Sequence, residues 1–178
     1  VETMATAKAL EFFTRTAGNV SAAARRAGVG RVVCVSIAGA SDPAVNKGYG
    51  YYRGKAAQEH AYRSSGLPLT IIHSTQWYEL LGTIVGRTVV GPVALVPTMK
   101  MAAVAADSVA RLVADEVGPT DDGTGLRTVA IRGPEVATAA EPARRVLDVQ
   151  GLIAGKSPRK VVEAPLLGRQ IAGGGLIP

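Results

Sequence analysis

Apolar and polar positions follow two distinct patterns along the first part of the chain. Over residues 5–27, apolar side chains recur three and four positions apart, which predicts a helix with one buried stripe. The members of this stripe are Leu10, Phe13, Ala17, Val20 and Ala24. Residues 31–37 (RVVCVSI) form a short apolar run rich in β-branched side chains, which predicts a strand buried on both faces, as in a parallel sheet.

A second strand follows after a helix, and the three segments form one unit. A loop is predicted around residues 42–50, a helix over 51–65 and a strand over 69–73. A strand, a crossover helix and a second strand in this order favour a parallel pair with a right-handed connection. We expect the helix over 5–27 to cover the opposite face of the sheet from the helix over 51–65.

The pattern is less regular beyond residue 74, but helices and strands still alternate. Asp107 is predicted to be the N-cap of a helix that ends before Gly118. The last residues, 164–178, have no clear period. The predicted helices cover 75–86, 107–117 and 134–150, the predicted strands 94–97 and 126–131, and a polar loop 120–125. The fold class is therefore α/β with a mostly parallel sheet.

The composition allows one core and argues against two classes of partner. The chain has 178 residues, of which 47% are hydrophobic, and its formal net charge is +6. Its cations are scattered singly or in pairs without interleaved aromatic side chains, so no nucleic-acid partner is expected. The most apolar window, 89–106, is broken by Pro92, Pro97 and Lys100, so no membrane partner is expected. No signal peptide is visible, and we expect a cytoplasmic location.

Disulfide, metal and phosphate-loop chemistry are not expected either. Cys34 is the only cysteine, which rules out an internal disulfide and a multi-cysteine zinc site. His60 and His73 are the only histidines, and neither has carboxylates at a metal-binding spacing. The glycine-containing stretches 28–33 and 151–157 lack the spacing of a dinucleotide or phosphate loop.

Tyr51 and Lys55 stand four residues apart at the start of the predicted helix over 51–65. Residues at this spacing share a helix face, so the ammonium would lie near the phenol and favour the phenolate. Tyr51 could then exchange a proton with a carbonyl or alcohol oxygen. Ser36 ends the preceding strand, where ligands meet parallel sheets, and could bind the same oxygen. The alternative is that Tyr51 only packs and that Lys55 is solvated.

Three stretches of the sequence resemble a known family. Residues 19–40 (NVSAAARRAGVGRVVCVSIAGA), 51–59 (YYRGKAAQE) and 65–79 (SGLPLTIIHSTQWYE) are similar to the NmrA-like, atypical branch of the short-chain dehydrogenase/reductase family. Residues 105–113 and 132–135 extend the resemblance to most of the chain. The resemblance implies part of a Rossmann fold that binds NAD(P), that is, a doubly wound parallel sheet with flanking helices.

The resemblance also implies roles for particular residues. Tyr51 and Lys55 would be the active-site tyrosine and lysine, and Lys55 would also bind the nicotinamide ribose. Ser36 would orient the substrate oxygen and lie against the cofactor. The loop that passes the nicotinamide would contain Ser74, Thr75 and Gln76, and the substrate pocket would be lined by Trp77 and Tyr78.

The function that the resemblance implies is hydride transfer between NAD(P)H and a small-molecule carbonyl or quinone-type acceptor. NAD and NADP are not distinguished, and a homo-oligomer is compatible with this expectation. Residues 1–88 would be the C-terminal portion of a Rossmann-like domain, and residues 89–178 a substrate-side region packed on it as a single domain.

The sequence departs from the family at three points, and these leave two alternative functions open. His73 stands where many members have arginine, and Ile37 follows Ser36 where a second serine or threonine is common. The chain also opens on a helix, whereas the family opens on a strand and a glycine-rich turn, so we expect a truncated sequence. The alternatives are a regulator that senses NAD(P) without turnover and an inactive truncated copy.

Overall fold

The computed structural model describes residues 6–47, 49–117, 125–151 and 156–178. They form two compact units, one made of the described residues within 1–74, 110–131 and 178, and the other of those within 75–109 and 132–177. The glycine expected in the loop at position 48 and most of the predicted loop 120–125 lie outside the described residues. The domain boundary expected after residue 88 stays a prediction.

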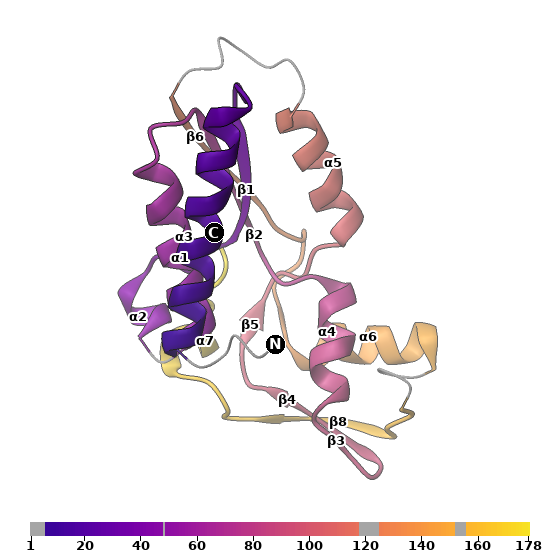
Figure 1. Ribbon diagram of the computed structural model, residues 1–178. Coiled ribbons are helices and arrows are strands. Elements are labelled where there is room, and N and C mark those ends of the chain that lie inside the picture. Colours follow the sequence, from indigo (N-terminus) through magenta and orange to yellow (C-terminus); the bar gives the residue numbers. More distant parts are fainter. Residues whose placement is uncertain (1–5, 48, 118–124, 152–155) are drawn as a thin grey trace. The chain divides into compact units, whose positions relative to one another are not determined.

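The first unit is built on a three-stranded parallel sheet in the order β1-β2-β6 (Figure 1). Its strands are β1 (Val32–Ile37), β2 (Leu69–Ser74) and β6 (Leu126–Ile131). Val32 pairs with Leu69, and Leu69 pairs with Leu126, so the three strands run in step. The predicted α/β fold with a parallel sheet is confirmed, and each of these strands begins and ends within one residue of its expected position.

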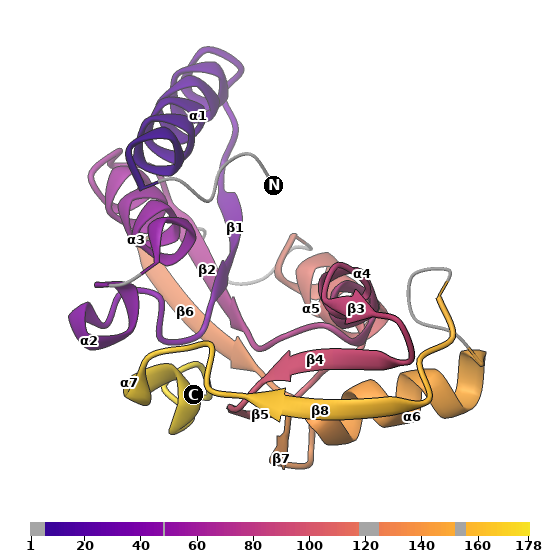
Figure 2. The same ribbon diagram turned by 90° about the horizontal axis from the view of Figure 1, so that it is seen from below.

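The helices α1 (Thr6–Arg26) and α3 (Gly50–Arg63) pack against each other on one face of this sheet (Figure 2). The expectation that they cover opposite faces is therefore wrong. The short helix α2 (Pro43–Asn46) lies where a loop was expected, and Asp42 caps it by accepting a hydrogen bond from the Ala44 amide. These helices and the strands share a hydrophobic core cluster of buried residues, namely Ala17, Cys34, Tyr62, Leu69 and Ile71.

Small residues let α1 and α3 approach closely. A Cβ atom at Gly54 on α3 would lie 2.4 Å from Cδ2 of Phe13 and 3.1 Å from the carbonyl oxygen of Ala9, both on α1. The apolar stripe expected on α1 is correct at Ala17 and Ala24, which are buried, but Val20 is 41% exposed and Ser21 is buried instead. The buried face of α1 is therefore rotated from the predicted one. The contact between α1 and α3 keeps both helices on one face of the sheet.

The helix α5 (Ala106–Val117) begins one residue earlier than expected. Both carboxylate oxygens of Glu79 accept a hydrogen bond from the Ala106 amide, at 3.2 and 3.0 Å, so this side chain caps the helix. Asp107 lies in the first turn, and its prediction as the N-cap is wrong. The C-terminal half of α5 joins the first unit through Glu116, whose carboxylate lies 2.9 Å from Nε of Arg127 on β6.

The described residues of the second unit form short strands and helices. The strands β3, β4 and β8 form one sheet, in which β3 and β4 are antiparallel and β4 and β8 are parallel, and β5 and β7 form an antiparallel pair. The elements are α4 (Tyr78–Gly86), β3 (Val89–Val90), β4 (Val93–Pro97), β5 (Lys100–Met101), β7 (Ala137–Thr138), α6 (Ala140–Gln150), β8 (Lys160–Ala164) and α7 (Arg169–Ala172).

The predicted helix over 134–150 begins only at Ala140, because the residues before it are held as extended chain. Ala137 pairs with Met101 on β5, and the Gly133 amide donates to the Ala102 carbonyl at 3.0 Å. A Cβ atom at Gly133 would lie 1.9 Å from the Ala103 carbonyl oxygen, so only glycine fits this approach. In the described residues, every helix is too short or too polar to cross a membrane.

Replacing Gly54 by alanine tests the close helix contact. The new methyl group would overlap Phe13, so we expect Gly54→Ala to lower the free energy of unfolding by about 1–3 kcal/mol despite the higher helix propensity of alanine. Gly18→Ala on α1 is the matched control, because no atom lies within 4 Å of its added Cβ, and we expect it to gain about 0.5–1 kcal/mol. Urea unfolding measures both, and equal gains for the two variants would contradict the packing described.

Candidate functional site

Polar side chains gather in the first unit where β1 and β2 reach their carboxyl ends. Ser36 on β1 pairs with His73 on β2, and Ser74 ends β2. The helix α3 adds two buried charged residues one turn apart, Lys55 and Glu59, which are 7% and 2% exposed. Ligands bind at the carboxyl edge of parallel sheets, so the position of this cluster is that of a binding site.

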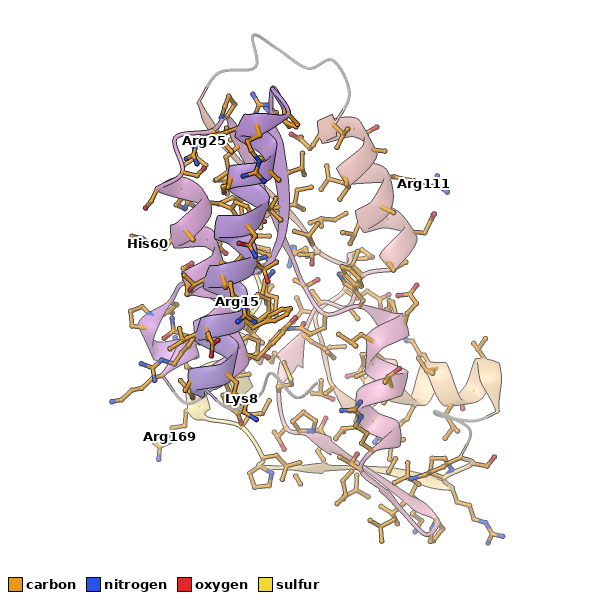
Figure 3. The ribbon with its side chains drawn as sticks, in the orientation of Figure 1. Lys8, Arg15, Arg25, His60, Arg111 and Arg169 are labelled. Carbon is orange, nitrogen blue, oxygen red and sulfur yellow. The ribbon has the colours of Figure 1, made fainter. Side chains whose placement is uncertain are left out.

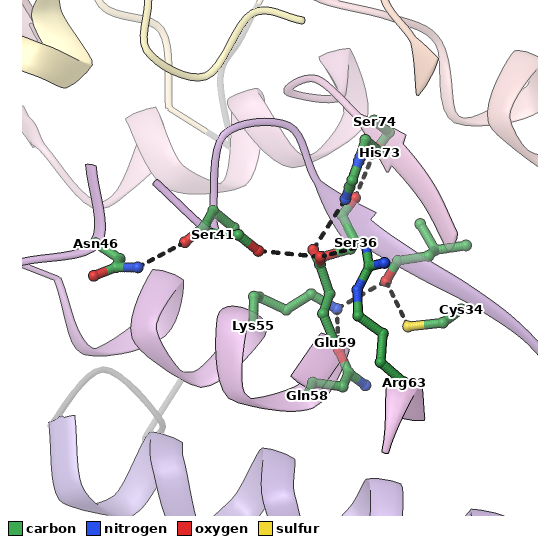
Figure 4. A network of polar contacts seen from close by, with 12 residues as sticks. Cys34, Ser36, Ser41, Asn46, Lys55, Gln58, Glu59, Arg63, His73 and Ser74 are labelled. Carbon is green, nitrogen blue, oxygen red and sulfur yellow. Dashed lines mark hydrogen bonds and ion pairs between the residues drawn. The ribbon is translucent and has the colours of Figure 1, made fainter. Parts of the chain in front are cut away.

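Glu59 is the centre of the cluster (Figure 4). The Ser36 hydroxyl donates to Oε1 of Glu59 at 2.5 Å, and Nε2 of His73 lies 3.1 Å from the same oxygen. The Ser41 hydroxyl donates to the other oxygen, Oε2, at 3.1 Å. Nη2 of Arg63 lies 3.7 Å from Oε2. Both carboxylate oxygens are therefore occupied by donors.

These donors set the charge state of Glu59. Burial by itself would raise the pKa of its carboxyl group, but the hydrogen bonds from His73, Ser36 and Ser41 outweigh burial and hold the pKa below its usual value. Glu59 is consequently an ionised group at neutral pH, and an ionised carboxylate only accepts hydrogen bonds.

Lys55 has the second buried charge, and its ammonium bonds to the strand. Its Nζ donates to the Val35 carbonyl at 2.8 Å and to Oε1 of Gln58. It also lies 5.4 Å from the centre of the Phe13 ring on α1, within the range of a cation–π contact. Burial lowers the pKa of Lys55 from its ordinary value. Two of its three N–H donors are thus used within the described part of the chain.

Tyr51 lies one turn before Lys55, but it is held by aromatic rings. Its ring meets Phe13 edge-on, with centroids 5.7 Å apart, and Tyr52 with centroids 5.9 Å apart. Burial raises the pKa of Tyr51, which is the opposite of the direction expected from a neighbouring Lys55. The Lys55 ammonium donates to Val35 and Gln58.

The loop after β2 contains the remaining predicted residues. The Ser74 hydroxyl donates to the Ser36 carbonyl at 3.4 Å within the first unit. Thr75 and Gln76 belong to the second unit, where the Thr75 hydroxyl donates to the Ala102 carbonyl and the Gln76 carbonyl accepts from Val104 at 2.9 Å. Both side-chain amide atoms of Gln76 are buried and lack a hydrogen-bond partner among the described residues.

Trp77 and Tyr78, the predicted substrate-side residues, begin the helical part of the second unit. Trp77 forms a parallel bridge with Val104, and Tyr78 is the first residue of α4. Both are partly exposed. The structure therefore brings together Ser36, Lys55 and Ser74 in one unit with Tyr51 on the same helix, and places the other four predicted residues in the second unit.

Sequence reasoning missed the residue with the most polar contacts in this region, Glu59. One signal was present, because Glu59 follows Lys55 by four residues and so shares its helix face. Ser41 and Gln58 were missed as well, since their donors and acceptors meet Glu59 and Lys55 only in the folded chain.

The cations of α1 are spread along the helix. Figure 3 shows Lys8, Arg15 and Arg25 spaced along α1, where Arg15 pairs with Glu11 at 3.1 Å. His60 is exposed on α3. Within the described ranges there is no group of three or more acidic, histidine or cysteine side chains that could hold a metal ion.

A shallow depression of about 310 Å³ lies at the other end of the first unit's sheet. It is lined by Arg63, Gly66, Leu67, Pro68, Leu69, Gly125 and Leu126, at the amino ends of β2 and β6. Ligands of parallel α/β sheets bind at the carboxyl ends instead, and the depression offers one charged side chain whose partner is Glu59. We therefore assign the candidate site to the Glu59 and Lys55 end.

Polar side chains of the two units, each taken by itself, suit parts of a dinucleotide. A nicotinamide ribose offers hydroxyl groups that a buried ammonium can bind, and Lys55 supplies that ammonium. A carboxamide offers both a donor and an acceptor, and the unpaired amide of Gln76 has the complementary pair. An orphaned buried amide is costly without a partner, so the Gln76 amide favours a polar ligand at its place in the second unit.

Comparison with known proteins shows the family and the fold. Residues 2–118 match the model of a family described as NAD(P)H-binding. Two similar structures are the Bordetella bronchiseptica enzyme WbmH in complex with NAD+ (19% identity, TM-score 0.60) and the Citrobacter sp. triphenylmethane reductase complexed with NADP(H) (20% identity, TM-score 0.55). A nucleoside-diphosphate-sugar epimerase from Staphylococcus aureus has 15% identity and a TM-score of 0.59. A comparison with curated proteins found no significant match.

The similar structures cover most of this chain but are much longer. They cover 88%, 85% and 84% of it, in the order WbmH, the reductase and the epimerase, while the chain spans 56%, 50% and 50% of their lengths. At these identities the likeness shows the fold alone. The predictions of a Rossmann-like fold, of an NAD(P)H-binding family and of NAD(P)H as the family's cofactor are confirmed, whereas the roles of individual residues stay predictions.

Removing the Glu59 charge tests the site's electrostatics. Because the pKa of Glu59 is held below its usual value of 4.5, its ionised form stabilises the fold above that pH, and this contribution is lost as the pH falls through the lowered pKa. We expect Glu59→Gln to cost about 1–3 kcal/mol at pH 7, and the difference from the wild type to shrink below about pH 4.5. Urea unfolding between pH 3 and 7 measures this difference.

The charged and titratable groups that face Glu59 are His73, Arg63, Lys55 and Cys34, and none of them is altered in this variant. Glu116→Gln is the matched control, because it removes another buried carboxylate of the same unit without touching Ser36 or His73. A Glu59→Gln difference that stays constant from pH 7 to pH 3 would contradict the assignment.

Proposed function

Because residues 2–118 match its model, the chain belongs to the NAD(P)H-binding family, and we propose that it works as an NAD(P)H-dependent oxidoreductase of the NmrA-like short-chain dehydrogenase type. The bound cofactor would supply the hydride, and the acceptor would be a small carbonyl or quinone-type molecule. The observation that supports this most is the buried Lys55 ammonium, which binds the carbonyl of Val35, the residue before Ser36, at the carboxyl edge of a parallel sheet.

The chain's own residues would bind the cofactor and hold the proton. Lys55 would give its remaining N–H donor to a ribose hydroxyl while the Val35 carbonyl fixes its position. The amide of Gln76, with the hydroxyls of Ser74 and Thr75, would orient the carboxamide of the nicotinamide. Tyr51 would exchange a proton with the substrate oxygen at its phenol oxygen.

The protonated form of Tyr51 suits the direction of reduction. Burial raises its pKa, so at neutral pH the phenol retains its proton and can donate it to a carbonyl oxygen. Trp77 and Tyr78 would offer apolar ring surface to the substrate and exclude water from it. In this proposal the protein contributes position and charge, and the hydride chemistry belongs to the cofactor.

A second candidate is a regulator that binds NAD(P)H without turnover. It is supported by the internal hydrogen bonds of the two key polar groups, since Ser36 donates to Glu59 and Lys55 donates to Val35 and Gln58. Such a protein would bind the cofactor as tightly as an enzyme does but transfer no hydride to any acceptor.

Tyr51→Phe separates the two candidates. If the chain is an enzyme, loss of the phenol proton lowers kcat by about 100-fold or more, while the dissociation constant for NADPH stays within about twofold of the wild type. The measurements are NADPH oxidation with quinone and aldehyde acceptors and calorimetric titration of the chain with NADPH.

Tyr52→Phe is the matched control for Tyr51→Phe. The neighbouring phenol lies partly buried on the same helix and has no proposed contact with cofactor or substrate, so its loss should leave kcat unchanged. Turnover that survives in Tyr51→Phe would contradict the role of Tyr51. NADPH binding by the wild type without turnover on any acceptor would favour the regulator.

A further inference from the structure

The Ser36 hydroxyl has only one proton to donate, and the structure shows where that proton goes. A serine hydroxyl has one donor and two acceptor lone pairs. Ser36 is 1% exposed, and its oxygen lies 2.5 Å from Oε1 of Glu59. Since an ionised carboxylate can only accept, Ser36 must be the donor in this hydrogen bond. A ligand that reaches the serine oxygen therefore meets lone pairs.

The carboxylate is held in this role from several elements. Ser41 and Arg63 contact Oε2, while His73 and Ser36 share Oε1. Rotation of the carboxylate away from Ser36 would break contacts with the loop before α2, with the neighbouring turn of α3 and with β2 at once. The direction of the Ser36 hydrogen bond is thus fixed by the surroundings of Glu59.

We propose that Glu59 is a positioning residue that makes Ser36 a hydrogen-bond acceptor, so that the substrate group bound at Ser36 is a hydroxyl and not a carbonyl. A carbonyl oxygen at this place would put its lone pairs against those of the serine. A substrate hydroxyl would instead donate a hydrogen bond to the Ser36 oxygen. The alcohol form of the substrate is therefore bound in preference to its carbonyl form.

This inference rests on the proposed function and narrows it. Hydride transfer is reversible, so binding the hydroxyl form more tightly changes which form of the substrate the site retains without changing the equilibrium of the reaction. The carbonyl is left to interact with Tyr51, whose phenol keeps its proton and can donate. Ser36 and Tyr51 would then have opposite hydrogen-bond roles in the same site.

The hydrogen bond itself is tested first, on the free chain at pH 7. We expect proton NMR to show a slowly exchanging hydroxyl proton that belongs to Ser36 and disappears in Ser36→Ala and in Glu59→Gln. Ser41→Ala is the matched control, because it removes a donor from Oε2 and leaves the Ser36 contact with Oε1. The exposed Ser64 provides the rate of a hydroxyl that exchanges with water.

His73 gives a second spectroscopic readout in the same samples. The chain has two histidines, so nitrogen-15 spectra resolve both rings, and the exposed His60 is the internal control. In the wild type we expect His73 to have its proton on Nε2, facing Glu59, and Glu59→Gln to change the tautomer population of His73 alone. A variant that is merely less stable would not change one ring selectively.

The ligand preference is tested with cyclohexanol and cyclohexanone as the probe pair. In the presence of saturating NADPH for the alcohol and NADP+ for the ketone, pairs that cannot transfer hydride, we expect the alcohol to bind roughly tenfold more tightly. The alcohol gains one hydrogen bond to Ser36, whereas the ketone meets its lone pairs. Glu59→Gln and Ser36→Ala should bring the two dissociation constants within about twofold of each other, while Ser41→Ala keeps the wild-type ratio.

The outcomes separate this inference from the proposed function. A Ser36 hydroxyl proton that exchanges as fast as that of Ser64 in the folded chain would overturn the positioning role of Glu59. Tighter binding of the ketone by the wild type would overturn the substrate assignment. If the chain binds neither NADP+ nor NADPH, the proposed function fails and the substrate assignment fails with it, while the two NMR readouts still decide the role of Glu59.

Discussion

A buried ammonium and a buried carboxylate one helical turn apart fix α3 against β1. Lys55 donates to the Val35 carbonyl, and Glu59 accepts from the Ser36 hydroxyl, so successive residues of the strand are bound by successive turns of the helix. Leaving one buried charge without its partner costs about 3–5 kcal/mol. A shift of α3 along β1 would break both contacts at once, which makes this register the one that satisfies both charges.

The helix α3 also packs against α1, at a position where α3 has no side chain. Gly54 on α3 has no side chain, and the edge of the Phe13 ring from α1 packs against it. That ring then contacts Tyr51 and lies 5.4 Å from the Lys55 ammonium. The packing of two helices therefore sets the surroundings of the predicted catalytic pair, and it explains why the phenol has aromatic neighbours and a raised pKa.

The sequence was sufficient to predict the parts of the fold that depend on local patterns. Continuous apolar runs located β1, β2 and β6, and the spacing of Tyr51 and Lys55 placed them correctly on one helix. The face covered by α1 was predicted wrongly, because a stripe of apolar residues shows that a helix is buried but not which element buries it. The two-residue strand β7 was missed because its pairing with β5 depends on a segment more than thirty residues earlier.

The candidate site was predictable only in part for the same reason. Glu59 meets Ser36 across 23 residues and His73 across 14, and neither spacing has a local signature. The histidine at position 73 was visible in the sequence as a departure from the pattern that the resemblance implies. The His73 ring contacts the same carboxylate oxygen of Glu59 that accepts the hydrogen bond from Ser36. This contact depends on how β2 and α3 are placed in the first unit.

The central claim is that the carboxyl edge of the first unit's sheet, with Lys55 and Glu59 behind it, binds a nicotinamide dinucleotide. Backbone amide NMR of the chain titrated with NADPH tests this most directly. We expect shifts that concentrate at residues 35–38, 51–59 and 73–74, with the depression around Arg63 and Leu126 unaffected. Shifts confined to that depression, or no shift at millimolar NADPH, would contradict it.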